Sequence, residues 1–342
     1  MKGPTDFAKH LAEFFTKYLA GERNASPHTI RSYRDTFLQL IFFMRMEKKV
    51  EAQHLTLDAL SKETILDFLD WVQRERNCGN ATRNYRLAAI HSFFRYLQYE
   101  CPEQISRWQG VLSIKVRKHQ KKSINYLSLE GIKPIFAQID TSHNTGRRNL
   151  AMLALLYDSG ARVQELIDLT PSSIRLEEPY TIKLLGKGRK ERIVPLQEEQ
   201  VDLLKSYIQE NKMLEPSNNQ HPLFFNRWGS NLTRPGIAYI LKTYSDLARK
   251  IDPALIPERV SCHVLRHSKA MHLLQAGVNL VYIRDILGHV SIQTTDIYAR
   301  ADSKQKREAL ENAYVDTIPE GARENQWENN PVLLEWLKGL GT

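Results

Sequence analysis

Nine polar residues in the second half of the chain are grouped in four short motifs that could do chemistry together. They are Arg162 and Glu165 in SGARVQEL, Lys187 and Lys190 in GKGRK, His263, Arg266 and His267 in HVLRH, and His289 and Tyr298 in LGHVSIQTTDIYAR. The i, i+3 and i+4 spacing within HVLRH places its three polar side chains on one face of a helix. The set is rich in N–H donors and includes no cluster of carboxylates.

Such a set suits a phosphodiester, whose negative charge grows in the transition state. Guanidinium groups match phosphoryl oxygens bidentately, and positioned cations are usually the largest electrostatic contribution to catalysis. Tyr298 is the candidate nucleophile. Its intrinsic pKa is about 10, so it needs cationic surroundings or an imidazole that accepts its proton. The departing sugar oxygen needs a proton, which a lysine on the GKGRK turn can deliver.

Each motif taken alone has a simpler interpretation. Arg162 would pair with Glu165 on a helix surface, GKGRK is typical of a solvated hairpin turn, and Tyr298 would be an aromatic at the edge of a core. HVLRH resembles a two-histidine zinc helix, but that motif has a glutamate where this chain has Val264. Because no acidic residue accompanies these histidines and the three cysteines lack metal-type spacing, we expect no metal.

The composition is that of a folded, basic protein long enough for two domains. The chain has 342 residues, and its 48 Lys and Arg against 39 Asp and Glu give a net charge of +9. This excess favours an anionic partner, nucleic acid first. The sequence has no apolar stretch long enough for a membrane span, no apolar N-terminal signal region and three cysteines without metal-type spacing. We therefore expect a cytoplasmic protein with no membrane partner and with reduced thiols.

The first hundred residues predict a compact bundle of four helices. The first helix spans about Asp6–Leu19, the second begins at the N-cap Ser26, the third follows Ser61 and the fourth starts after Asn80. Arginines on the polar faces are either solvated or contact DNA. These candidates are Arg31, Arg34, Arg83, Arg86 and Arg95.

A basic segment separates the two halves of the chain. SIKVRKHQKKS contains no acid, so it repels itself and should be an extended linker. It is either a solvated tether or a strap across a phosphate backbone, and we favour the strap. Its candidate DNA contacts are Lys115, Arg117, Lys118, Lys121 and Lys122. We place the helical domain at residues 1–107, the linker at 108–125, the catalytic domain at 126–315 and a tail at 316–342.

The second half predicts a mainly helical domain with one small sheet. YTIKLL and ERIVPL are two β segments joined by the GKGRK turn. Helices are expected before them, from Ser128 and up to Gly160, and after them at about Glu198–Asn211, Arg234–Arg249, His263–Ala276, Val281–Leu287 and Ile292–Tyr298. The tail ends in PVLLEWLKGLGT, a short apolar helix that needs a surface on its own domain or on a neighbouring copy.

The order of ARVQEL, GKGRKERIVPL, HVLRH, LGH and TTDIYAR resembles that of the tyrosine site-specific recombinases, also called the phage integrase family. The resemblance covers the whole catalytic domain, and the bundle and basic linker are similar to that family's core DNA-binding region. It implies a mainly α fold, with an N-terminal four-helix, SAM-like bundle and a mixed, mostly helical catalytic domain with a small antiparallel β-sheet. The chain looks most like the simple two-domain Xer form.

The resemblance also implies roles at the phosphate. Arg162 and Arg266 would clamp the scissile phosphate, and His289 would hydrogen-bond to it. Tyr298 would attack to form a 3′-phosphotyrosyl link. Lys187 would protonate the leaving 5′ oxygen.

Other roles follow from the same resemblance. His263 would assist Tyr298 as acid and base, whereas His267 and Glu165 would be supporting residues. Lys190 would replace the neighbouring lysine of the turn if the general acid lies later in it. No metal, ATP or other cofactor is implied.

The implied partners are double-stranded DNA with a specific recombination site and three further copies of the chain, in a homotetramer on two sites. We favour integration, excision or transposition of a mobile element, because the acidic, Trp-containing tail differs from the compact end of Xer-type proteins. Xer-type chromosome or plasmid dimer resolution is the alternative. A type IB topoisomerase and a catalytically silent DNA-binding regulator are less favoured.

Overall fold

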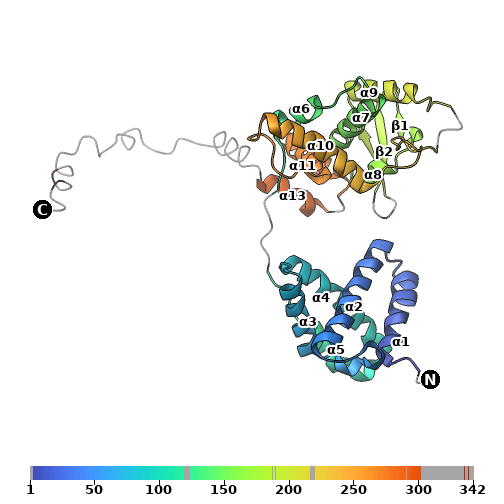
Figure 1. Cartoon of the computed structure of the whole chain (residues 1–342), viewed down its shortest axis with the longest axis vertical. Coiled ribbons are helices and arrows are strands. Elements are labelled where there is room, and N and C mark those ends of the chain that lie inside the picture. Colours follow the sequence, from blue (N-terminus) through green and yellow to red (C-terminus); the bar gives the residue numbers. More distant parts are fainter. Residues whose placement is uncertain are drawn as a thin grey trace. The chain divides into compact units, whose positions relative to one another are not determined.

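The computed structural model describes residues 3–118, 124–186, 188, 190–215, 220–289 and 291–301, together with Glu335 and Lys338. Lys121, Lys122 and Lys187 lie outside these residues, as does almost all of the predicted C-terminal tail. The chain divides into two compact units, Met1–Lys122 and Ser123–Thr342 (Figure 1). Both are mainly helical, and the second contains a small antiparallel sheet, which confirms the predicted fold class.

Unit 1 contains the four predicted helices and a fifth. Its α-helices are α1 (Asp6–Glu13), α2 (Pro27–Glu47), α3 (Lys62–Glu75), α4 (Asn80–Glu100) and α5 (Ile105–Leu112), and a π-helical turn, Phe14–Glu22, continues α1. The hydroxyls of Ser26 and Ser61 accept backbone N–H bonds at the starts of α2 and α3. These N-caps are the ones that the sequence predicts.

Aromatic side chains form the centre of unit 1. Phe14, Phe37 and Phe93 come from the π-helical turn, α2 and α4, and they are at most 2% exposed. The ring centroid of Phe93 lies 5.2 Å from those of Phe14 and Phe37, at steep interplanar angles. Edge-to-face packing of this kind adds to the burial of apolar area. The polar faces of the helices therefore stay free for other contacts.

Helix α5 corrects the predicted start of the linker. Trp108 and Val111 are fully buried in the core of unit 1, and the Trp108 indole donates to the carbonyl of Cys101 at 3.1 Å. The Trp108 ring also packs edge-on against Phe94. Residues 108–112 therefore belong to the first unit rather than to a linker, because their apolar side chains complete its core.

Unit 2 has the predicted succession of helices around a sheet. Its helices are α6 (Leu129–Ala137), α7 (Asn144–Asp158), α8 (Val163–Ile167), α9 (Glu198–Glu210), α10 (Arg234–Ile251), α11 (Cys262–Gln275), α12 (Leu280–Leu287) and α13 (Ile292–Ala301). The strands β1 (Ile174–Arg175), β2 (Thr181–Leu185) and β3 (Glu191–Pro195) pair antiparallel in that order. The two-residue strand β1 is too short to leave an alternating pattern in the sequence.

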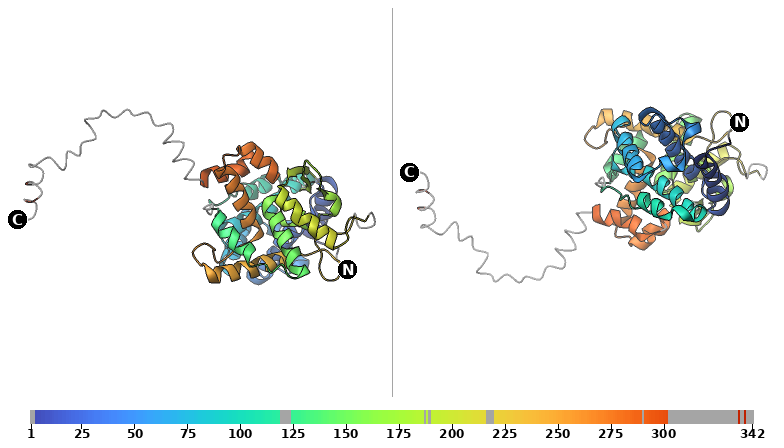
Figure 2. Two further views of the ribbon diagram at one scale, coloured as in Figure 1. Left: turned by 90° about the horizontal axis from the view of Figure 1, so that it is seen from above. Right: turned by 90° about the horizontal axis from the view of Figure 1, so that it is seen from below.

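The core of unit 2 is built around α7, which lies inside the unit in Figures 1 and 2. Every residue from Ala151 to Leu156 on this helix is buried. Gly160, with φ of +58°, then turns the chain in the left-handed region that favours glycine. The turn brings Arg162 to the start of α8, and a separate cluster of buried side chains joins α11, α12 and α13 around Tyr298.

Candidate active site

An ionic network joins α8 to the sheet. The Glu165 carboxylate accepts bonds from the Arg162 backbone N–H at 2.8 Å and from its guanidinium at 2.7 Å. Arg192 on β3 donates two further bonds to the same carboxylate, at 3.0 and 2.7 Å. The Glu165 side chain is only 4% exposed and that of Arg192 10% exposed. We call Arg162, Glu165 and Arg192 the clamp network.

The clamp network keeps the Glu165 carboxylate ionised. Burial, the largest single influence, works against ionisation, but the hydrogen bonds and charges of Arg192 and Arg162 together outweigh it and lower the Glu165 pKa to about 2. A buried carboxylate with two arginine partners has a fixed position. The Arg162 guanidinium is consequently held in place while its side chain remains 34% exposed.

Arg192 also connects β3 to the end of α12, and it was not among the residues that the sequence singles out. Its Nε donates to the carbonyl of Ile286 at 2.8 Å. Gly288, the left-handed C-cap of α12, leaves room for this arginine, because a Cβ there would lie 2.9 Å from the Arg192 Cδ. The position of Arg192 on the strand after the basic turn was the available signal, but its partners are 27 and 94 residues away.

Arg266 lies deeper than Arg162. It is 4% exposed, and its guanidinium donates to the carbonyls of Gly160 and Leu287. Burial, and then the nearby Arg162 and Arg192, lower its pKa to about 10. Carbonyl oxygens and an anion are the partners that suit such a buried guanidinium.

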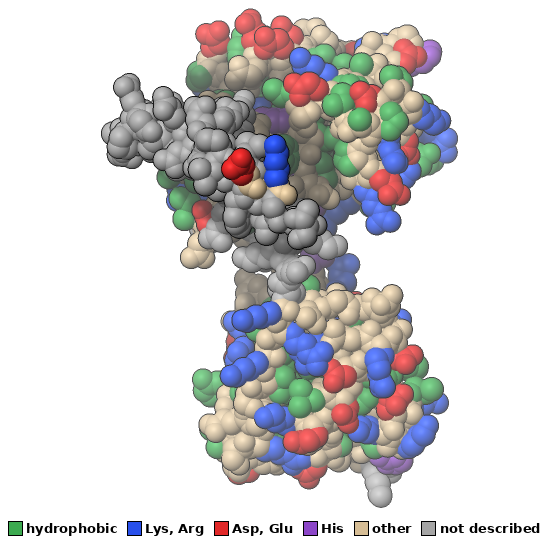
Figure 3. All heavy atoms as spheres, turned by 90° about the vertical axis from the view of Figure 1, so that its left-hand side faces the viewer, with side chains coloured by type: hydrophobic (Ala, Val, Ile, Leu, Met, Phe, Trp, Pro, Cys, Tyr) green, Lys and Arg blue, Asp and Glu red, His purple; other side chains and the backbone are tan. Residues whose placement is uncertain are grey.

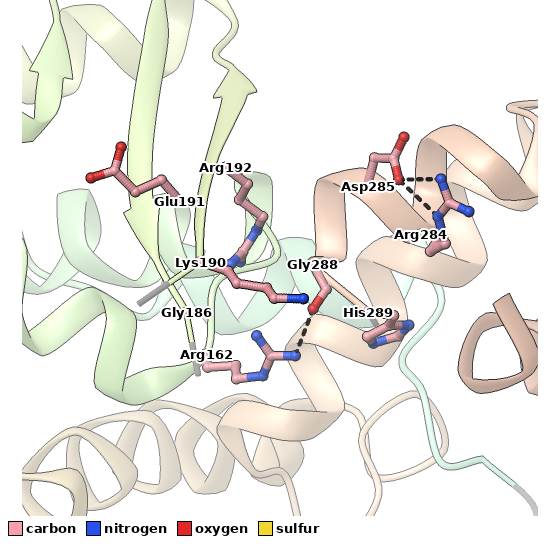
Figure 4. A pocket seen from close by; sticks show the side chains of 9 residues that line it. All are labelled: Arg162, Gly186, Lys190, Glu191, Arg192, Arg284, Asp285, Gly288 and His289. Atoms are coloured by element: carbon pink, nitrogen blue, oxygen red, sulfur yellow. Dashed lines mark hydrogen bonds and ion pairs between the residues drawn. The ribbon is translucent and has the colours of Figure 1, made fainter. Parts of the chain in front are cut away.

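A pocket of about 520 Å³ opens beside these arginines (Figure 4). It is lined by Arg162, Gly186, Lys190, Glu191, Arg192, Arg284, Asp285, Gly288 and His289. Figure 4 shows the Lys190 side chain extending from the β2–β3 turn toward Arg162 and Gly288, while Arg284 pairs with Asp285 at the rim. Lys187, the predicted general acid, lies outside the described residues. Of the two candidate general acids, the structure therefore describes only Lys190, which lines the pocket.

Tyr298 lies on α13 and is 1% exposed. Its hydroxyl lies 2.9 Å from Nδ1 of His267. Its ring stacks on that of His289, with centroids 6.4 Å apart and an interplanar angle of 10°. Burial raises the Tyr298 pKa, and the charges of Arg266 and Arg162 oppose that rise. Tyr298, the predicted nucleophile, is therefore a neutral phenol close to the predicted phosphate ligands.

The three histidines occupy different places around Tyr298. His267 contacts the hydroxyl, whereas His263, one helical turn earlier on α11, is exposed and its ring centroid lies 6.4 Å from that of His267. His289 lines the pocket, and its Nδ1 lies 2.9 Å from the hydroxyl of Thr295. Burial, followed by nearby arginines and His267, lowers the His289 pKa to about 4. This ring is therefore neutral at physiological pH.

The predicted DNA contacts of unit 1 differ in availability. The exposed ones are Arg31, Arg34, Arg95, Lys115, Arg117 and Lys118, and Arg86 is half-buried with a bond to the Thr36 hydroxyl. Figure 3 shows Lys and Arg side chains interspersed with Asp and Glu over the visible face of this unit. Arg83 differs from the others, since it is 1% exposed and does not reach the surface.

The basic segment explains the burial of Arg83. The Asn84 amide and the Arg117 backbone exchange two bonds, at 2.8 and 3.0 Å, and Asn80 donates to the carbonyl of Lys118. Asn80, Arg83 and Asn84 lie on one face of α4. The segment therefore runs over that face, and Arg117 bonds to Asp70 on α3 at 2.8 Å. We call residues 114–118 the strap.

Two family models match the chain. The phage integrase family matches residues 125–305, and the N-terminal SAM-like domain of phage integrases matches residues 12–100. The chain belongs to the tyrosine recombinase (phage integrase) family. It is thus an enzyme of the class that cleaves and rejoins DNA strands, as the sequence predicts.

Several tyrosine recombinases resemble the chain over most of its length. It is 34% identical to the integrase/recombinase-type protein y4rC of Sinorhizobium fredii (strain NBRC 101917 / NGR234), over 96% of this chain and 97% of that protein. It is 31% identical to tyrosine recombinase XerD of Listeria monocytogenes (serotype 4b, strain F2365), over 84% of this chain and 93% of that one. Both spans include the bundle and the catalytic domain.

Solved structures show the same fold. The XerH site-specific recombinase bound to its difH substrate in a pre-cleavage complex is 25% identical, with a TM-score of 0.64 over 86% of this chain and 83% of that one. The integrase of transposon Tn1549 in complex with transposon right end DNA has a TM-score of 0.66 over 89% of this chain and 99% of that one. At 16% identity the second likeness concerns the fold alone.

The described residues contain neither a membrane-spanning helix nor a cluster of metal-ligating side chains. None of their helices combines the length and apolar character needed to cross a bilayer. No three histidine, cysteine or acidic side chains among them are grouped as a metal site.

Proposed function

We propose that this enzyme is a site-specific DNA recombinase that works through a 3′-phosphotyrosyl intermediate. The observation that carries the proposal is the convergence of Arg162, Arg266, His289 and Tyr298, which come from four separate segments of unit 2. Two guanidinium groups and a neutral imidazole can stabilise the charge that develops on a phosphoryl group under attack. The buried phenol beside them is the nucleophile.

The reaction needs a proton for the leaving oxygen. As the Tyr298 oxygen bonds to phosphorus, its proton passes to His263, the acid and base that the resemblance implies. The P–O5′ bond breaks and the 5′ oxygen takes a proton from Lys187. Lys190, which lines the pocket beside Arg162, is the alternative general acid. A 5′ hydroxyl of a partner strand then attacks the phosphotyrosyl link and releases Tyr298, so the energy of the phosphodiester is retained and neither ATP nor a metal is required.

The proposed DNA surface includes the exposed cations of unit 1 and the strap. Arg31, Arg34, Arg95, Lys115 and Lys118 are its described members, and Lys121 and Lys122 would extend it. Each phosphate that such a cation neutralises releases counterions and adds affinity that falls with salt. Arg83 would join this surface only if the strap left α4. The exposed Arg117 and the half-buried Arg86 would join it by releasing Asp70 and the Thr36 hydroxyl, respectively.

The proposed assembly is a homotetramer on two DNA sites, with the C-terminal segment docking on a neighbouring copy. Deleting residues 316–342 should then weaken assembly and strand exchange and leave DNA binding intact. Unchanged recombination by the truncated chain would exclude this role for the tail.

For the biological role we propose integration, excision or transposition of a mobile element. The likeness to y4rC, which extends over nearly the whole chain, supports this role. Xer-type dimer resolution is the second candidate, and the likeness to XerD proteins favours it. Sequencing the DNA at sites cleaved in the host distinguishes them: the ends of a mobile element support the first, and a single chromosomal or plasmid resolution site supports the second.

The decisive experiment asks whether the enzyme becomes covalently joined to DNA. Nicked suicide duplexes drawn from DNA flanking the gene are incubated with the full chain without Mg²⁺, and adducts are resolved on a denaturing gel. We expect an adduct with the wild type and none with Tyr298→Phe. Specific binding without any adduct would favour a silent regulator, and relaxation of supercoiled DNA without site preference would favour a type IB topoisomerase.

A further inference from the structure

We propose that the start of α4 is a phosphate site that the strap covers in the free chain, and that duplex DNA displaces the strap and pairs with Arg83. This inference rests on the proposed function and deepens it, because it says when part of the DNA surface forms. Arg83 is 1% exposed, and neither its Nε nor its Nη1 has a hydrogen-bond partner among the described residues. A guanidinium does not lose its proton in a protein, so Arg83 is a buried cation.

No carboxylate in the described part of unit 1 pairs with Arg83. The nearby acid is Asp70 on α3, which lies beside α4 (Figure 1), but Asp70 already bonds to the Arg117 guanidinium at 2.8 Å. Burial, followed by the charge of Arg117, lowers the Arg83 pKa, and Asp70 opposes this shift. The five residues after the strap, HQKKS, contain no acid either. Because a buried cation without a counter-charge is costly, an anion that reached Arg83 would be stabilising.

The position of Arg83 on its helix points to the same kind of ligand. Arg83 is the fourth residue of α4, and the N-cap Gly79 supplies no side-chain oxygen to the first backbone N–H groups. The start of a helix carries partial positive charge, which favours anions and disfavours a nearby cation. The buried guanidinium and the helix start therefore both favour a phosphate at this place.

The strap is held over this place by contacts that lie at the surface. Asn84 exchanges two bonds with the backbone of Arg117, at 2.8 and 3.0 Å, and Asn80 donates to the carbonyl of Lys118 at 2.8 Å. Val116, the apolar residue between the strap's cations, is 68% exposed. Exposed hydrogen bonds contribute little to stability, because water competes for both partners. The cover can therefore be removed without disturbing the core of unit 1.

Displacement exchanges these surface bonds for contacts with phosphate. The DNA backbone approaches the start of α4, the strap leaves, and a phosphate pairs with Arg83. The amides of Asn80 and Asn84, which held the strap, become free to donate to the same backbone. The lost bonds to the strap are offset because a buried cation gains its counter-charge.

The first test measures both stability and DNA binding in Arg83→Met. Replacing a buried charge by an apolar side chain of similar length should raise the urea midpoint of the free chain. Binding to duplexes drawn from the DNA flanking the gene should weaken, and the slope of log Kd against log salt should fall by about 0.9, the value for one phosphate. Arg45→Met is the matched control, because Arg45 is an exposed arginine of α2 that pairs with Glu51. It should raise neither the midpoint nor change the slope.

Two results of this test would overturn the proposal. A lower urea midpoint in Arg83→Met would show that the fold stabilises the arginine where it lies. An unchanged salt slope would show that Arg83 does not reach a phosphate in the complex. If the wild type binds no duplex at all, the proposed function fails, which is a separate result, because the change in midpoint is measured without DNA.

A second measurement follows the strap in the wild type. The Arg117 backbone N–H donates to the Asn84 side chain in the free chain, so its hydrogen exchange should be slowed. Duplex DNA should speed exchange at the strap, because displacement breaks this bond, and should leave exchange around the buried Phe93 unchanged. Unchanged or slower exchange at the strap in the DNA complex would mean that the strap stays on α4, and would overturn the displacement.

Discussion

The clamp network and the nucleophile lie in the same unit but are held in different ways. The Glu165 carboxylate receives four charge-assisted or backbone bonds from Arg162 and Arg192, which fix helix α8 against strand β3. The Tyr298 hydroxyl is held by one imidazole, and its ring rests against a second. The clamp network thus has a strong ionic framework, whereas the nucleophile is kept by weaker contacts in a buried position.

This difference separates binding from reaction. The Arg162 guanidinium is partly exposed and oriented before any DNA is present, so it can bind a phosphate without rearrangement. Tyr298 is 1% exposed, so the proposed reaction requires it to move before its oxygen reaches phosphorus. In the proposed function the phosphate-binding groups are thus already oriented by the fold, whereas the reacting group is buried beside them.

The largest effect on activity should come from Tyr298→Phe. Removing the hydroxyl eliminates the nucleophile, so no covalent adduct should form. The buried ring remains, and only one hydrogen bond is lost, so the free energy of unfolding should change by about 1 kcal/mol. Adduct gels and urea unfolding measure the two effects. An adduct that survives in Tyr298→Phe would assign the nucleophile to another residue.

The largest effect on stability should come from Glu165→Gln. This change leaves Arg162 and Arg192 near each other without their buried counter-charge, which should cost about 3–5 kcal/mol. Glu191→Gln is the matched control, because Glu191 is 55% exposed in its pair with Lys183 and should contribute less than about 1 kcal/mol. Urea unfolding compares the two variants. Equal losses would contradict the picture of a rigid clamp network.

The sequence predicted the parts of this comparison that depend on local spacing. The i, i+3 and i+4 pattern put His263, Arg266 and His267 on one helix, and the two β segments and the helix that ends at Gly160 lie where expected. Local spacing could not show which of the two histidines, one helical turn apart, contacts Tyr298. That contact depends on where α13 packs against α11, which brings Tyr298 next to His267.

Contacts between distant segments were the main omissions. Arg192 appeared as one more cation after a basic turn, and only the folded chain shows that it joins Glu165 to Ile286. The predicted linker, residues 108–125, includes Trp108, although its basic residues begin only at Lys115. The burial of Trp108 against Phe94 shows that one large apolar side chain can outweigh a basic neighbourhood.

As the pH falls, the contribution of His289 to the free energy of unfolding should be lost before that of Glu165 in the clamp network. The His289 pKa falls from 6.5 to about 4 on folding, so the unfolded chain binds the proton first and this contribution to stability is lost between those values. The Glu165 pKa falls from 4.5 to about 2, so its contribution is complete above 4.5 and is lost as the pH falls toward 2. Each contribution is on the order of 3 kcal/mol.

Two variants show which residue causes each of these losses of stability. The difference in unfolding free energy between wild type and His289→Asn should change between pH 6.5 and 4, and that between wild type and Glu165→Gln below pH 4.5. Thermal or urea unfolding across this pH range measures both differences. If the difference for Glu165→Gln changed at a higher pH than that for His289→Asn, acid would destabilise the clamp network before it destabilised the surroundings of Tyr298.

A smaller loss of stability than that of Glu165→Gln should come from Arg192→Lys, which keeps the charge but not the forked geometry. A lysine cannot make two bonds to Glu165 and a third to the carbonyl of Ile286, so we expect a loss of about 1–3 kcal/mol. Arg175→Lys on β1 is the control, because the Arg175 guanidinium bonds to the exposed carbonyl of Glu178 and the change should be close to neutral. If the ionic framework orients Arg162, adduct formation by Arg192→Lys should fall more than its DNA binding does. Equal losses of binding and cleavage would instead mean that the framework only maintains the fold.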